Sequence, residues 1–286
     1  MCRRVNLQPY IKGFYFVYFL LLSGCANLYQ PEGLENLSYK HVKKVASTLY
    51  RVTFKDSMPI EEYVTKNIYV YNNKGRLIWS PKTNKSGEEI KAGSRFFYNK
   101  RGFKIKDITY NNDSIVYIQF DYEYNKYGLM TKETANRWGK KETTEIKWDR
   151  KNRKSHSSRI FHDGKSGGKT TRKFDENWRE IEVNVFDTIG NQVKKYTKDY
   201  DQLGNLKIQK TYGSSGKLLS FTNMFYNNRN DRIKSVTSKI IDGDTITNEK
   251  GTKYEYIYDN KGNRLVERLF FNDKLYMIAK NEITYF

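Results

Sequence analysis

Few residues in this sequence have the types and spacing that catalysis or ligand chemistry requires. The clearest case is Gly164–Thr170 (GKSGGKT), which suggests a phosphate-binding loop. The P-loop pattern needs four residues between its first glycine and the Gly-Lys-Thr, whereas this segment has three. No amphipathic helix follows that would bring a helix N-terminus to a phosphate. We therefore interpret the segment as a glycine-rich hairpin turn.

A second group, His156, His162 and Asp163, has side chains that could bind a metal or transfer protons. A zinc site needs three or four converging ligands, and two histidines six residues apart on one strand face lie roughly 20 Å from each other. No nucleophile-elbow motif surrounds Ser157 or Ser158. The sequence thus predicts a protein that is not an enzyme, with no catalytic residue, no metal site and no cofactor.

The N-terminal segment carries the one cysteine with recognisable chemistry. Residues 1–13 are polar and basic, and Phe14–Leu22 is an apolar run of nine residues. As a helix this run would span roughly 13 Å, less than half of the ~30 Å hydrocarbon core, so it has the layout of a secretory signal and not of a membrane span. The following Leu22-Ser23-Gly24-Cys25 resembles the lipobox of bacterial lipoproteins.

The lipobox resemblance implies a processing route. Cleavage would fall between Gly24 and Cys25, the thiol of Cys25 would carry diacylglycerol, and its new amino group would be acylated. Two or more acyl chains anchor a protein stably, whereas one does so only marginally. We therefore expect residues 1–24 to be a signal peptide, residues 25–38 to be the lipidated cysteine with a tether, and residues 39–286 to form a repeat domain.

Composition and charge narrow the fold and the partners. The chain has 24 Tyr, a mean hydropathy of −0.84 and a formal net charge of +20, which becomes +17 when Arg3, Arg4 and Lys12 leave with the signal peptide. Such a field favours anionic partners; alternatively, Lys and Arg only solubilise an exposed sheet and protect its edges. Basic residues among aromatics also suit nucleic acid, but export makes nucleic acid an unexpected partner.

One short block recurs along the body of the chain. It consists of an aromatic residue, Asn or Asp, two variable residues, and then Gly or Asn. The spacing indicates a period of about 13 residues. The leading aromatics are Tyr71, Tyr98, Tyr124, Trp148, Phe174, Phe186, Tyr200, Tyr226 and Tyr258, with Tyr212 in a variant copy.

This block has the chemistry of a hairpin turn. The Asx side chain accepts a hydrogen bond from the backbone two residues later, and Gly or Asn supplies the positive φ. Between turns the chain alternates: Tyr254, Tyr256 and Tyr258 are expected on one strand face, and residues 206, 208, 210 and 212 on another. Residues 40–54 fit a strand better than a helix because of their β-branched content.

The predicted fold is therefore all-β. We expect one elongated antiparallel meander of repeated β-hairpins, about 16–20 strands in a single twisted or curled sheet, whose stability is nearly one-dimensional. The blocks at Tyr200–Leu206 and Tyr258–Leu265 resemble YD repeats of the RHS type, and the chain is similar to the RHS-repeat lipoproteins of the Bacteroidetes. A second similarity is to MORN-type hairpin repeats.

The sequence supports two hypotheses about the function of the protein. Our first hypothesis is a non-catalytic, lipid-anchored protein of the bacterial cell envelope, on the periplasmic or surface side. It would present a basic, Tyr-rich surface to a glycan, an anionic envelope polymer or a protein partner. The RHS resemblance implies an alternative, an accessory or immunity protein of a polymorphic-toxin system.

Overall fold

The computed structural model describes residues 41–286. The predicted signal peptide, the predicted lipidation site Cys25 and the predicted tether lie outside the described residues. For residues 40–54 the sequence favours a strand over a helix, and the structure places Val42–Lys55 in a strand. None of the described residues forms a helix, so none forms a helix able to span a membrane.

The described residues form nineteen strands, each antiparallel to its neighbours. The all-β antiparallel meander predicted from the repeats is therefore confirmed. In chain order the strands are β1 (Val42–Lys55), β2 (Met58–Tyr71), β3 (Leu77–Thr83), β4 (Glu89–Tyr98), β5 (Lys104–Tyr110), β6 (Val116–Tyr124), β7 (Met130–Arg137), β8 (Lys140–Asp149), β9 (Lys154–Ile160), β10 (Ser166–Phe174), β11 (Glu180–Phe186), β12 (Gln192–Tyr200), β13 (Leu206–Tyr212), β14 (Leu218–Tyr226), β15 (Arg232–Ile241), β16 (Asp244–Thr247), β17 (Thr252–Tyr258), β18 (Arg264–Phe271) and β19 (Lys274–Tyr285).

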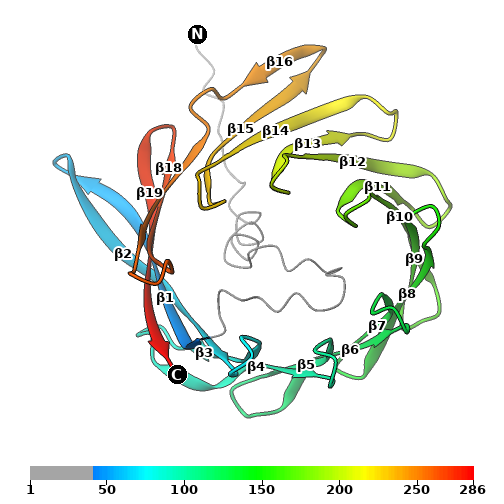
Figure 1. The fold of residues 1–286 in the computed structure, drawn as a ribbon, viewed down its shortest axis with the longest axis horizontal. Coiled ribbons are helices and arrows are strands. Elements are labelled where there is room, and N and C mark those ends of the chain that lie inside the picture. The colour runs from blue at the N-terminus through cyan, green and yellow to red at the C-terminus, as the bar shows by residue number, and fades with distance from the viewer. Residues whose placement is uncertain (1–40) are drawn as a thin grey trace, which may run out of the picture. The chain divides into compact units, whose positions relative to one another are not determined.

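The sheet closes on itself, which corrects the expectation of an open or curled sheet. β1 pairs with both β2 and β19, so the first and last strands lie side by side (Figure 1). β15 pairs first with the short β16 and then, through only two residue pairs, with β17. The ring therefore holds eighteen strands, with β16 beside β15. Closure removes the unpaired edges that an open sheet would expose, and it joins residues more than 200 positions apart, so the fold is not one-dimensional.

The turns have the predicted Asx chemistry. In the turn after β2, Asn72 Oδ1 accepts hydrogen bonds from the backbone N–H of Lys74 and of Arg76, both at 3.0 Å. Gly75 N–H donates to the Asn72 carbonyl at 2.9 Å and has φ +74°. The same side-chain bonds recur in the turns that begin at Asn84, Asn99, Asn111, Asn125, Asp175, Asp187, Asp201, Asn227 and Asp259.

A β-bulge follows many of these turns and changes which residues share a face. Across the turn after β12, Tyr200 pairs with Leu206 but Asp199 pairs with Ile208, so Lys207 is the extra residue. Leu206 and Ile208 therefore face opposite sides, in contrast to the alternation expected from the sequence. The physical reason is that a bulge inserts one residue into one strand and shifts the pleat by one position.

Cross-strand pairing places the repeat tyrosines on one side of the sheet. The core cluster of this side contains the buried residues Tyr122, Met130 and Ile146 with Trp148 packed beside them. Tyr256 and Tyr258 lie on this side with ring centroids 6.1 Å apart. We call it the tyrosine face.

Candidate functional site: two rims of turns

Successive turns of an antiparallel meander lie at opposite ends of the strands, so the turns divide into two sets. The first set, the basic rim, consists of residues 72–76, 99–103, 125–129, 149–153, 175–179, 201–205, 227–231 and 259–263. The second set, the acidic rim, consists of residues 56–57, 84–88, 111–115, 138–139, 161–165, 187–191, 213–217, 242–243 and 272–273.

The two rims differ in charge. The basic rim holds eleven Lys or Arg and six Asp or Glu, whereas the acidic rim holds three Lys and seven Asp or Glu. Nine of the basic side chains on the basic rim are exposed: Lys74, Lys100, Arg101, Lys126, Arg150, Lys151, Arg153, Arg229 and Lys261.

The carboxylates of the basic rim are mostly hydrogen-bonded within their own turns, and eleven bases against six acids leave the rim with an excess of five positive charges. Asp175 accepts from the backbone of Arg179 and forms an ion pair with its side chain, and Asp231 pairs with Arg264. Burial opposes ionisation of Asp259, but hydrogen bonds from Tyr285 and Asn263 lower its pKa to about 2. Within the described residues, the lysines of this rim make no ion pair.

A repeated hydrogen bond is made by the aromatic that precedes Asx in five turns of the basic rim. Tyr124 OH donates to the carbonyl of Lys104, the first residue of the preceding strand, at 2.7 Å. β5 and β6 are joined by a turn at the acidic rim, and their backbone pairing stops at Lys106 and Asp121, before the strands reach the basic rim. The tyrosine hydroxyl therefore donates to a backbone carbonyl that lies beyond the paired part of the two strands. The same bond is made by Tyr98 to Leu77, Tyr200 to Glu180 and Tyr226 to Leu206, and by the indole N–H of Trp148 to Met130. Tyr256, two residues before the block aromatic Tyr258, makes a comparable bond to Arg232 on β15.

Phe174 occupies the equivalent position on β10 but has no hydroxyl. Its ring is 2% exposed and packs against Trp148, at 5.4 Å between centroids, and against Trp178, at 6.0 Å. In this repeat the β9–β10 ladder reaches Lys154, and the Phe174 N–H donates to the Arg153 carbonyl at 2.9 Å, so the strand ends are paired without a hydroxyl.

Basic side chains also join neighbouring turns on this rim. Arg150 lies over the Tyr127 ring of the preceding turn at 3.6 Å, and Arg229 lies over Tyr258 at 4.6 Å. Lys261 lies over the ring of Tyr285, the last residue of β19, at 3.5 Å. Cation–aromatic stacking at exposed sites contributes roughly 0.5–1 kcal/mol each, and it leaves the cation accessible to an anion.

The tyrosine face contains acid–base groups that the sequence did not reveal. Asp107 Oδ2 accepts from Tyr122 OH and from Lys104 Nζ, both at 2.8 Å, and the ammonium lies 4.5 Å from the Tyr122 ring. Burial, followed by the charge of Asp107, raises the pKa of Tyr122, and burial raises the pKa of Glu133.

A comparable cluster lies on β15–β18. Arg264 pairs with Asp231, Tyr258 OH donates to Asp231, and Arg232 donates to Tyr254 OH at 3.1 Å. Burial raises the pKa of Glu267 in the same cluster. Because such acid–tyrosine–base groups recur in different repeats, we interpret them as structural hydrogen bonds and ion pairs that hold neighbouring strands together.

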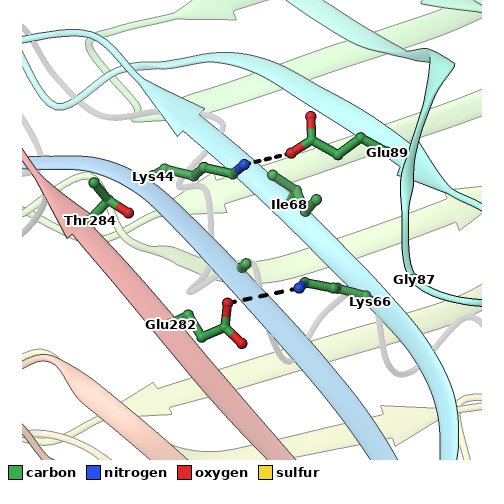
Figure 2. A pocket seen from close by; sticks show the side chains of 8 residues that line it. Lys44, Lys66, Ile68, Gly87, Glu89, Glu282 and Thr284 are labelled. Carbon is green, nitrogen blue, oxygen red and sulfur yellow. Dashed lines mark hydrogen bonds and ion pairs between the residues drawn. The ribbon is translucent and has the colours of Figure 1, made fainter.

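A shallow groove of about 290 Å³ lies on the opposite side of the sheet, over β19, β1 and β2 (Figure 2). Lys44 pairs with Glu89 at 2.5 Å and Lys66 with Glu282 at 3.8 Å, each across the groove. Both ion pairs are internal, so the groove has little unpaired charge to offer a ligand.

The residues considered for catalysis are not brought together. His156 lies on β9, and His162 and Asp163 lie in the turn that follows. Gly164 belongs to that turn and Ser166–Phe174 is a strand, so the GKSGGKT segment is a turn and strand. Among the described residues, no group of three or more His, Cys, Asp or Glu side chains is arranged to hold a metal ion.

Comparisons with known proteins find no sequence relative and only solved structures of low similarity. No protein-family model and no curated protein matches this chain. A porin-like protein from Bacteroides uniformis ATCC 8492 is similar in structure with a TM-score of 0.30 and 14% identity, over 85% of this chain and 96% of that one. A chain of the TcdB2–TccC3–Cdc42 crystal structure gives 0.19 and 12%, over 72% of this chain and 15% of that one. Similarity this weak carries no argument about function.

Proposed function

We propose that this protein is a non-catalytic, lipid-anchored protein of the bacterial cell envelope whose basic rim binds an acidic polysaccharide. The observation that carries the proposal is the unequal charge of the two rims. Exposed bases of the basic rim project from adjacent turns, while most of its carboxylates are held by their own turns. A linear polyanion can contact several such turns at once.

Spacing supports a linear ligand. Adjacent strands lie about 4.8 Å apart, so successive turns on one rim are separated by roughly 9.6 Å. Contacts such as Arg101 Nη1 to the Lys126 carbonyl, at 3.1 Å, hold adjacent turns together. Exposed cations in the four successive turns from 72–76 to 149–153 favour a polymer with regularly spaced carboxylates over a single small anion.

Two triple variants of the full chain test the rim. Lys74→Glu with Lys100→Glu and Lys151→Glu changes the basic rim, and Lys85→Glu with Lys165→Glu and Lys217→Glu changes the net charge equally on the acidic rim. Binding to polygalacturonate at low salt is measured, with neutral dextran as the reference. We expect the first variant to weaken binding roughly tenfold or more and the second to have little effect.

Three other outcomes would contradict binding of the polysaccharide by the basic rim. An equal loss in both variants would attribute binding to total charge. No binding of the unchanged protein to polygalacturonate, or equal binding to dextran, would contradict the proposal.

The lipid anchor is tested separately. The Leu22-Ser23-Gly24-Cys25 motif supports it. Cells expressing the unchanged protein or Cys25→Ala are given a radioactive fatty acid, and the label on the protein is compared. We expect label only on the unchanged protein; equal label would remove the anchor from the proposal.

A further inference from the structure

The turn between β7 and β8 on the acidic rim combines three features that each cost stability. Trp138 is 71% exposed and has φ +49°, a region that bulky residues rarely adopt. Two-residue turns with positive φ at both positions strongly prefer Asn-Gly, whereas this turn is Trp138-Gly139. Arg137 and Lys140 are direct cross-strand partners, which places like charges opposite each other.

The neighbouring strand extends this exposed tip. Tyr117 on β6 makes an edge-on contact with Trp138, with ring centroids 4.7 Å apart. Ile115 and Val116, which precede it, are 62% and 47% exposed. Exposed apolar side chains therefore gather at two adjacent chain reversals, with Trp138 and Ile115 in the turns and Val116 and Tyr117 at the start of β6, of which Tyr117 is the one beside Trp138.

Cations border this patch. Arg137, Lys140 and Lys141 are exposed, and in the described part of the chain none of them makes an ion pair. Trp and Tyr favour the boundary between lipid headgroups and acyl chains, and basic residues beside them are attracted to anionic headgroups. Local features that each cost stability tend to coincide at functional sites.

We propose that this tip, formed by Ile115–Tyr117 and Arg137–Lys141, inserts into the surface of a membrane rich in anionic phospholipid. At the β7–β8 turn the apex side chain is apolar and the flanking ones are basic, which matches the order of acyl chain and phosphate at such a surface. The proposal is independent of polysaccharide binding by the basic rim.

The test reads the position of Trp138 alone. The purified full chain is mixed with phosphatidylcholine vesicles containing phosphatidylglycerol and bromine-labelled acyl chains, and tryptophan emission is recorded. The same measurement on Trp138→Phe is subtracted, so the difference reports position 138 whatever else attaches the chain to the vesicle. We expect this difference signal to be quenched.

Charge dependence completes the test. Lys140→Glu with Lys141→Glu should reduce the vesicle partitioning of the tip, measured by the same quenching, roughly fivefold for each lysine. Lys217→Glu with Lys85→Glu, on the same rim but away from the tip, should leave it unchanged. Trp138→Asn suits the turn backbone, and co-sedimentation of that variant with the vesicles, at an unfolding temperature no lower than that of the unchanged protein, should be weaker.

The result that would overturn the proposal is an unquenched difference signal in vesicles containing phosphatidylglycerol. Quenching that is equal with pure phosphatidylcholine would contradict the role of the lysines. A response of Trp138 to a neutral oligosaccharide without bromolipid quenching would assign the tip to sugar binding and would also contradict the proposal.

Discussion

The basic and acidic rims are made by the same kind of chain reversal, yet they are constructed differently. Turns of the basic rim contact one another through stacked cations, tyrosine hydroxyls and the Trp148–Phe174–Trp178 cluster. Exposed apolar residues at turn apices occur on both rims, with Trp138 and Ile189 on the acidic rim 71% and 82% exposed and Leu203 on the basic rim 75% exposed, so the repeated contacts between turns are what distinguish the basic rim. The difference shows that one end of the strands can be stabilised by contacts between turns while the turns at the other end differ in charge and carry exposed side chains.

The largest effect is expected where the basic rim relies on packing. Phe174→Ala should lower the free energy of unfolding by about 3–5 kcal/mol, because the ring is fully buried against two tryptophans. Ile189→Ala on the acidic rim should change it by less than about 0.5 kcal/mol. Urea unfolding followed by tryptophan fluorescence measures both, and similar losses would contradict the contrast between the rims.

A smaller effect is expected from the tyrosine hydroxyls. Tyr124→Phe removes the donor to the Lys104 carbonyl and should lower stability by about 1–3 kcal/mol, since a half-buried acceptor is left unpaired. Tyr276→Phe, at an exposed position of β19, is the matched control and should be nearly neutral. The idea of ladder completion by the hydroxyl fails if the two variants unfold at the same urea concentration.

The turn at Trp138 should respond in the opposite direction. Trp138→Asn should raise the free energy of unfolding by about 1 kcal/mol, because Asn tolerates the left-handed backbone better than Trp does. Thermal unfolding measures the gain. A loss of stability instead would show that the exposed ring stabilises the fold through its contact with Tyr117.

The acid dependence of the basic rim is expected to be the smallest effect. The pKa of Asp259 is lowered to about 2 in the folded protein, so its contribution is present above the unfolded pKa of about 3.9 and is lost as pH falls toward 2. Asp259→Asn should therefore show a weaker loss of stability between about pH 4 and pH 2. Asp242→Asn on the acidic rim serves as the control, and an identical acid profile for both variants would contradict this role of Asp259.

Much of the fold follows from local chemistry that the sequence displays. An aromatic, an Asx and a positive-φ residue at a regular interval determine where the chain reverses, as the bonds of Asn72 and Asp259 show. The unequal charge of alternate turns was also present in the sequence, and sorting the turns into two sets would have revealed it. The bulges at positions such as Lys207 were not visible, because a one-residue shift depends on pairing with the neighbouring strand.

The sequence by itself determined the strands, the turns and their chemistry, because Asx hydrogen bonds and strand alternation act over a few residues. Only the tertiary structure decided that β1 pairs with β19, that tyrosine hydroxyls complete the ladder, and that Asp107, Tyr122 and Lys104 meet. Ring closure joins residues at opposite ends of the chain, and the number and stagger of the strands between them decide whether those ends meet. No local sequence pattern determines the combined number and stagger of all the strands.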